Sequence, residues 1–120
     1  MSNSIEIHRP INSRYAFEAD EFVTRNKIYE AVIPQIKKER VGEEVAELMF
    51  HILNAPEDML SEVEIKIANN FRALGNYSLS TGDIVVVDEE YFLCESFGWK
   101  KIENPIYPLI NHTSVEKVII

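Results

Sequence analysis

Three short apolar runs separated by polar turns stand out between residues 83 and 102. Short β-prone runs that alternate with turn residues are typical of antiparallel hairpins. The pattern therefore predicts a compact three-stranded β-meander. We expect its strands at 84–87, 91–95 and 99–102, with turns at 88–90 and 96–98 and an opening turn that ends in Gly82-Asp83.

A helical period dominates residues 43–53. At 100° per residue, the apolar side chains of this segment cover an arc of about 200°. One neighbouring element cannot cover so wide an arc. We expect the meander to be one of the elements that pack on this helix, because its apolar residues need a cover. The apolar residues are Val45, Ala46, Leu48, Met49, Phe50, Ile52 and Leu53, whereas Glu43, Glu44, Glu47 and His51 fall on the other side.

Two further elements are expected before this helix. The alternation Ile5-Glu6-Ile7-His8 predicts a short strand that ends at Pro10. A first helix is expected to begin near Asp20 and to end or kink at Pro34. Its apolar face would hold Phe22, Tyr29, Val32, Ile33 and Ile36, with Gly42 as a later stop.

The segment 57–74 fits two patterns. As a helix it places Leu60, Val63, Ile67, Phe71 and Leu74 on one stripe, with Gly75 after its end. As a strand, 62–67 alternates between polar and apolar residues. We favour the helix because it explains a longer stretch, and the strand remains the alternative. The apolar run 115–120 is β-prone and is expected to pair at a sheet edge.

Together these elements predict the α+β class: two or three helices packed on a small antiparallel β-meander or sheet. The length of 120 residues favours a single domain over 1–120. Apolar residues make up 46% and charged residues 27%, which is ordinary for a folded protein. The single Cys94 excludes an internal disulfide. The chain lacks an N-terminal leader and any apolar run near the roughly 18 residues of a membrane span, so we expect a cytoplasmic protein without membrane contact.

Charge is unevenly distributed. Twelve Lys and Arg against twenty Asp and Glu give a net charge of −8. Seven acids and no Lys or Arg lie between Glu43 and Glu64, and five more acids lie between Asp83 and Glu95. Such stretches repel phosphate backbones. The basic residues form only the small groups Lys37-Lys38-Arg40 and Lys100-Lys101, which are too few for a typical nucleic-acid interface. We therefore expect no direct binding to duplex nucleic acid.

A family resemblance enters at the meander. The run Ser78-Leu79-Ser80-Thr81-Gly82-Asp83-Ile84-Val85-Val86, followed by Tyr91, Glu95-Ser96-Phe97-Gly98-Trp99 and Ile102, resembles the core of the YodL-like domain family. That family carries a pattern close to S-L-S-x-S-D-V-V, then an aromatic strand and D-S-x-G-[FW]. Gly82 stands where a Ser is common, and Glu95 stands where an Asp is common. The resemblance implies an accessory protein of plasmids, prophages or the polyvalent proteins of mobile elements, without established enzymatic activity.

The meander also supplies the candidate binding residues. Ser80, Thr81 and Asp83 offer hydroxyls and a carboxylate, and the amides near Gly82 suit an anion. The simpler interpretation, which we prefer, is that Ser80 and Asp83 satisfy the backbone of their own turn. Aromatic residues and one acid complete the set of candidates: Tyr91, Glu95 and Trp99. We expect Phe97 in the core and Trp99 at a rim, because its indole N–H needs a partner.

The sequence offers little evidence for a catalytic site or a metal site. Glu43, Glu47 and His51 share a helix face, but metal sites need three or four converging ligands, and we expect neither a metal nor a cofactor. Cys94 lies in an apolar strand flanked by acids, which should raise the pKa of its thiol and leave it inert. His8, His51 and His112 fall on different elements. We expect no enzyme.

The leading hypothesis is a protein–protein interaction module that recruits a partner protein or forms a homo-oligomer. Self-association would use Phe50 and the apolar C-terminal residues Val118, Ile119 and Ile120. The first alternative is an acidic nucleic-acid mimic that regulates a defence enzyme, although the density of negative charge along this chain is low for such a mimic. The second alternative is an uncharacterised enzyme.

Overall fold

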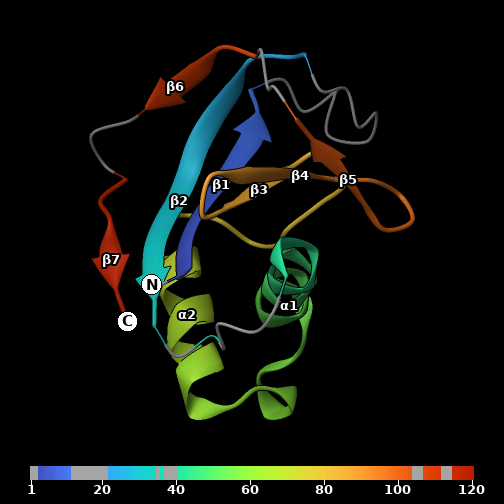
Figure 1. Ribbon diagram of the computed structural model, residues 1–120. Helices are drawn as coiled ribbons and strands as arrows, with labels where there is room; N and C mark the ends of the chain where they lie inside the picture. The colour runs from blue at the N-terminus through green and yellow to red at the C-terminus, as the bar shows by residue number, and fades with distance from the viewer. Residues whose placement is uncertain (1–2, 12–21, 35, 37–40, 104–106, 112–114) are drawn as a thin grey trace.

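The computed structural model describes residues 3–11, 22–34, 36, 41–103, 107–111 and 115–120. Within them a mixed sheet of seven strands has two α-helices on one face (Figure 1). This confirms the α+β class, with a sheet larger than the predicted meander. The elements are β1 (Asn3–Pro10), β2 (Arg25–Ile33), α1 (Gly42–Asn54), a 3₁₀ turn (Glu57–Met59), α2 (Glu62–Ala73), β3 (Ile84–Val87), β4 (Glu90–Cys94), β5 (Trp99–Ile102), β6 (Leu109–Asn111) and β7 (Val118–Ile119).

The predicted meander is present as β3, β4 and β5, which pair antiparallel. Asp88 and Glu89 both have positive φ, at 46° and 74°, which is the two-residue turn whose twist matches the strands. α1 covers β3 and β4 as expected. The strand order of the sheet is β5-β4-β3-β1-β2-β6, and β7 also pairs with β2. The predicted pairing of the C-terminal run at a sheet edge is therefore confirmed.

The helix predicted to begin near Asp20 is wrong. Residues 12–21 lie outside the described part of the chain, and residues 25–33 form β2, which pairs antiparallel with β1. The buried side chains of Tyr29, Ala31 and Ile33 alternate with half-buried ones, a period of two that the helical interpretation overlooked. Pairing with β1 stabilises residues 25–33 as a strand, because the preference of a segment for β structure depends on its neighbouring strands.

The helical interpretation of the ambiguous segment is confirmed for α2, but the helix begins at Glu62 and not at Glu57, because residues 57–59 form a separate 3₁₀ turn. Ser61 accepts a hydrogen bond from the Glu64 N–H, and the Glu64 carboxylate accepts one from the Ser61 N–H, which is a capping box. This local signal fixes the first turn of the helix. Gly75, at φ 88°, follows the C-cap residue Leu74, as the pattern predicted.

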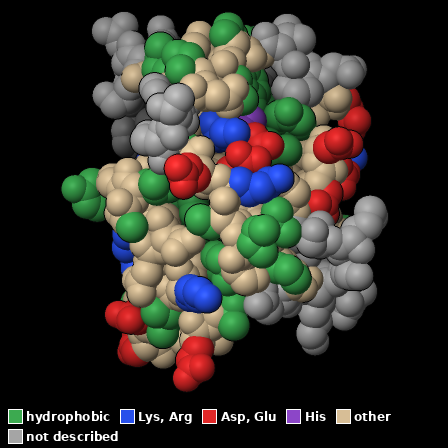
Figure 2. Space-filling view, turned by 90° about the vertical axis from the view of Figure 1, so that its left-hand side faces the viewer, with side chains coloured by type: hydrophobic (Ala, Val, Ile, Leu, Met, Phe, Trp, Pro, Cys, Tyr) green, Lys and Arg blue, Asp and Glu red, His purple; other side chains and the backbone are tan. Residues whose placement is uncertain are grey.

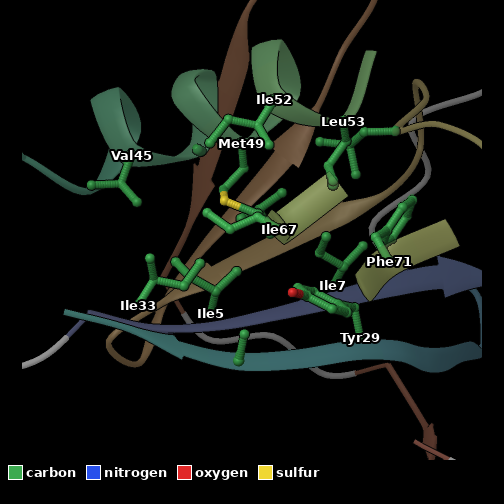
Figure 3. Close-up of a cluster of buried hydrophobic side chains, with 14 of the residues drawn as sticks. Ile5, Ile7, Tyr29, Ile33, Val45, Met49, Ile52, Leu53, Ile67 and Phe71 are labelled. Carbon is green, nitrogen blue, oxygen red and sulfur yellow. The ribbon is translucent and has the colours of Figure 1, made fainter. Parts of the chain in front are cut away.

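The main core lies between the two helices and the sheet (Figure 3). Strand residues face helix residues across it, and Tyr29 meets Phe71 edge to face at 5.5 Å between ring centroids. The labelled core residues are Ile5, Ile7, Tyr29 and Ile33 from the strands and Val45, Met49, Ile52, Leu53, Ile67 and Phe71 from the helices.

The opposite face of the sheet carries a second, smaller apolar cluster, formed by Ile84, Val86, Leu93 and Ile102 with Tyr91 and Tyr107 against it. On the side formed by β2, β6 and β7, basic and acidic side chains lie next to each other (Figure 2), and Lys27 pairs with Glu30 at 2.8 Å. Neither helix of the described chain has the length and apolar character that would let it cross a membrane.

Candidate functional site

A groove lies between α1 and the β4–β5 hairpin. Its larger part is a hollow of about 600 Å³. A smaller hollow of about 160 Å³ adjoins it and shares Glu47, Gly98 and Trp99. We call the two together the acidic groove. The larger part is lined by Glu43, Glu44, Glu47, Leu48, His51, Gly98 and Trp99, and the smaller part adds Phe50, Cys94, Glu95 and Ser96.

Helix α1 supplies one wall because its polar residues recur at helical spacing along one strip. Trp99, on β5, supplies the other wall. The Trp99 indole N–H donates to the Glu47 carboxylate at 2.7 Å, and its ring meets Phe50 edge to face at 6.3 Å. The predicted rim position of Trp99 is confirmed: it is half-buried with its N–H satisfied. Both contacts hold the indole against α1.

The prediction that Phe97 lies in the core is wrong. Its side chain is 96% exposed. Glu95 N–H donates to the Gly98 carbonyl at 3.0 Å, which leaves Ser96 and Phe97 at the tip of a tight hairpin. That hairpin extends beyond the sheet (Figure 1), so an aromatic residue at its tip cannot reach back to the core. Phe97 therefore lies exposed in the hairpin, between Ser96 and Gly98, which line the acidic groove.

In the run Ser78–Asp83, Ser80 and Asp83 satisfy the backbone of their own turn, which is the interpretation that we preferred. Ser80 N–H donates to the Asp83 carboxylate at 2.8 Å, and Asp83 N–H donates to the Ser80 carbonyl at 3.0 Å. Gly82 has φ 96°, a conformation that favours glycine in this turn. Thr81 is half-buried beside it. The Ser80 N–H, the Ser80 carbonyl and the Asp83 carboxylate are therefore used within the turn.

The Asp83 carboxylate is fully buried and forms a two-point ion pair with Arg9, at 3.0 and 2.8 Å. Burial raises the pKa of the Asp83 carboxyl, and the Arg9 guanidinium opposes that rise. Arg9 also donates to the Ser78 carbonyl. Arg25, itself fully buried, donates to the Gly82 carbonyl at 2.9 Å. These two arginines tie β1 and β2 to the turn before β3.

Helix α1 is joined to the same run. Asn54 donates to the Leu79 carbonyl at 2.9 Å and accepts from the Leu79 N–H at 2.8 Å. Leu79 itself is buried in the main core. Backbone groups of Ser78, Leu79, Ser80 and Gly82 and the Asp83 carboxylate thus have internal partners.

Tyr91 lies on the face of the sheet away from the helices. There His8, 1% exposed, lies 3.0 Å from a Glu6 carboxylate oxygen and 2.5 Å from the Tyr107 hydroxyl. The hydrogen bond with His8 lowers the pKa of Glu6, whereas burial raises the pKa of both Tyr91 and Tyr107. A carboxylate, an imidazole and a hydroxyl therefore stand in a row. A phenol whose pKa is raised keeps its proton at neutral pH, and the contacts of His8 link β1 to Tyr107.

The predicted rise in the pKa of the Cys94 thiol is confirmed. Burial, with Asp83, Glu47 and Glu95 nearby, raises the pKa of its thiol to about 12. Such a thiol remains protonated at neutral pH and is a poor nucleophile.

The four predicted interface residues occupy different settings. Phe50 packs against Trp99, and Val118 and Ile120 pack against the main core. Ile119 is 76% exposed. The Ile120 N–H donates to the Val32 carbonyl at 3.0 Å, which continues the pairing of β7 with β2. Of the four, Ile119 contributes most of the exposed apolar surface.

No group of three or more potential metal ligands converges within the described residues. His8 lies on β1 and His51 on α1, whereas His112 and the basic group Lys37-Lys38-Arg40 lie outside the described part of the chain. Sequence reasoning missed Arg9, Arg25 and the row Glu6–His8–Tyr107. Their partners are up to 99 residues away, and no local pattern marks such contacts.

No protein-family model, curated protein or solved structure matches the chain.

Proposed function

We propose that this protein is a non-enzymatic protein-binding module whose acidic groove receives a basic segment of a partner protein. One observation carries the proposal: a hollow of about 600 Å³ has carboxylates of Glu43, Glu44 and Glu47 on one wall and the indole of Trp99 on the other. A volume of this size is typical of binding sites.

A cationic side chain suits both walls. Carboxylates attract Lys or Arg, and the face of an indole attracts a cation by about 0.5 to 2 kcal/mol. The exposed Phe97 follows the lining residue Ser96 along the chain and offers the same partner an apolar contact, since aromatic residues are common anchors of protein interfaces. The carboxylates and the indole of the acidic groove therefore both favour a partner segment with cationic side chains.

The buried nucleophile candidates support a binding role over catalysis. The thiol of Cys94 and the phenol of Tyr107 both have raised pKa values because they are buried. An accessory role on a plasmid or prophage, implied by the resemblance to the YodL-like family, remains part of the proposal. Self-association also remains part of it, through the exposed Ile119 on β7.

The test is a titration followed by the fluorescence of Trp99, the one tryptophan of the chain. We expect blocked lysine-rich peptides to change this fluorescence with salt-sensitive affinity, and glutamate-rich peptides of equal length to leave it unchanged. A cation about 5 Å from each of two carboxylates gains about 0.8 kcal/mol from each in water, so Glu43→Gln with Glu44→Gln should weaken binding about tenfold.

A matched control removes the same charge elsewhere. Glu57 and Asp58 are exposed on the 3₁₀ turn and do not line the groove. The double variant Glu57→Gln with Asp58→Asn should bind the lysine-rich peptide within about twofold of the wild-type protein. Equal losses in the two double variants, or no response of Trp99 to basic peptides, would contradict the proposal.

A further inference from the structure

We propose that the partner segment binds as an added β-strand along β5, with alternate basic side chains entering the acidic groove. This inference rests on the proposed function and adds its mode of recognition. β5 is the last strand of the sheet order on its side, and among the described residues it pairs with β4 alone. An edge strand of this kind presents hydrogen-bonding groups to another chain.

The hydrogen bonds of β4 show which groups of β5 face outward. The Cys94 N–H donates to the Asp83 carbonyl, and the Cys94 carbonyl accepts from the Gly82 N–H, so both polar groups of Cys94 face away from β5. Its neighbour Leu93 therefore faces β5 and pairs with Lys100.

The same alternation continues along β5. Because the backbone groups of Lys100 point toward β4, those of Trp99 and Lys101 point to the open edge. The bond from Glu95 N–H to the Gly98 carbonyl agrees, since it places the polar groups of Gly98 on the inner side and those of Trp99 on the outer side. Two residues of β5 thus offer both an N–H and a C=O to a partner strand.

The open edge and the groove also match in position and length. The Trp99 side chain points from β5 to α1, where it meets Glu47, so the groove lies beside this edge. From Glu43 to His51 the helix strip is about 12 Å long. An extended segment of four residues covers about 13 Å, the length of β5 itself.

The charge pattern selects the occupant. In an antiparallel added strand, the residues opposite Trp99 and Lys101 turn their N–H groups to β5 and their side chains to the groove side. Glu43, Glu44 and Glu47 then favour Lys or Arg at these alternate positions. The charge of Lys101, which lies opposite one of these positions, is balanced by its 2.9 Å ion pair with Glu90.

The probe is a blocked octapeptide of alternating lysine and threonine, titrated with Trp99 fluorescence as the readout. Methylation of its lysine backbone nitrogens removes the donors that face β5, whereas methylation of its threonine nitrogens removes donors that face solvent. We expect the first peptide to lose at least tenfold in affinity and the second to stay within about threefold.

A pair of protein variants tests the same edge from the other side. Lys101→Pro removes the outward N–H, and Lys101→Ala keeps it, while both lose the 2.9 Å ion pair with Glu90. We expect Lys101→Pro to bind the octapeptide about tenfold more weakly than Lys101→Ala. The methylated peptides act on the wild-type protein, so the test stands even if Lys101→Pro fails to fold.

The outcomes separate the two proposals. If the octapeptide binds but both methylated forms bind equally well, strand addition is wrong and the groove proposal stands. If the unmodified octapeptide does not bind, both are wrong. If the protein is instead a dimer that Lys101→Pro converts to a monomer in sedimentation experiments, the edge belongs to a second copy and the inference is overturned.

Discussion

The ion pair between Arg9 and Asp83 should contribute to stability asymmetrically. The Asp83 side chain is 0% exposed, whereas that of Arg9 is 27% exposed. Arg9→Met leaves a buried carboxylate without its main partner, and Asp83→Asn leaves a guanidinium that water still reaches. The two single variants therefore break the same contact with different consequences.

The expected losses follow from the burial. Removing one partner of a buried pair costs about 3 to 5 kcal/mol, and we expect Arg9→Met to fall in this range at pH 7. Asp83→Asn keeps an acceptor for the Ser80 N–H and should cost about 1 to 3 kcal/mol. The double variant should cost less than the sum, because it removes both charges.

The loss in Arg9→Met should also depend on pH. Burial raises the pKa of Asp83 above its ordinary value of 3.8, and without Arg9 less opposes that rise. The folded variant then binds a proton more readily than the unfolded chain does. Its deficit relative to the wild-type protein should shrink as pH falls from 7 toward 4 and grow as pH rises again.

Urea denaturation followed by Trp99 fluorescence and far-UV circular dichroism measures these free energies at pH 7 and pH 5. Three results would refute the reasoning: Arg9→Met costing no more than Asp83→Asn, single losses that simply add in the double variant, or a deficit of Arg9→Met that does not change with pH.

Three further variants test particular contacts by the same denaturation assay. Gly42→Ala should destabilise by about 1 to 3 kcal/mol, because its Cβ would lie 2.6 Å from Phe92 Cζ in the core; a gain in stability would contradict this close approach. Glu89→Gly should stabilise by about 0.5 to 1 kcal/mol, since Glu89 has φ 74°, whereas a loss would argue against that turn. Burial raises the pKa of Tyr29 to about 12, so stability should fall between pH 10 and 12 as the unfolded chain releases this proton first. In Tyr29→Phe the loss of unfolding free energy between pH 10 and 12 should be smaller by up to about 3 kcal/mol. The same alkaline loss in Tyr29→Phe and in the wild-type protein would contradict this role of Tyr29.

Local patterns predicted the elements whose signals are local. α1 has an apolar arc, α2 has a capping box, and the β3–β5 meander has turn residues at each reversal. The strand β2 was missed because its pairing with β1 is not visible in its own sequence, and its apolar residues also allowed a helical period. Phe97 was misplaced because hydrophobicity alone does not show that a residue lies at the tip of a two-residue turn.

The candidate site was predicted in pieces. Trp99 and Glu95 came from the meander, Phe50 from the wide helix face, and Glu47 from a helix strip considered for metal binding. The structure joins them through contacts such as the hydrogen bond between Trp99 and Glu47, which are 52 residues apart. A pattern on one element cannot show that two elements form one groove.

The most direct test of the central claim is an NMR titration of the ¹⁵N-labelled protein with the blocked octapeptide of alternating lysine and threonine. We predict that the largest shift changes occur at the Trp99 indole N–H and at the backbone amides of 43–51 and 98–101, which border the acidic groove. Val118–Ile119, on the far edge of the sheet, should stay unchanged. Changes centred on Val118–Ile119, with none at Trp99, would contradict the account.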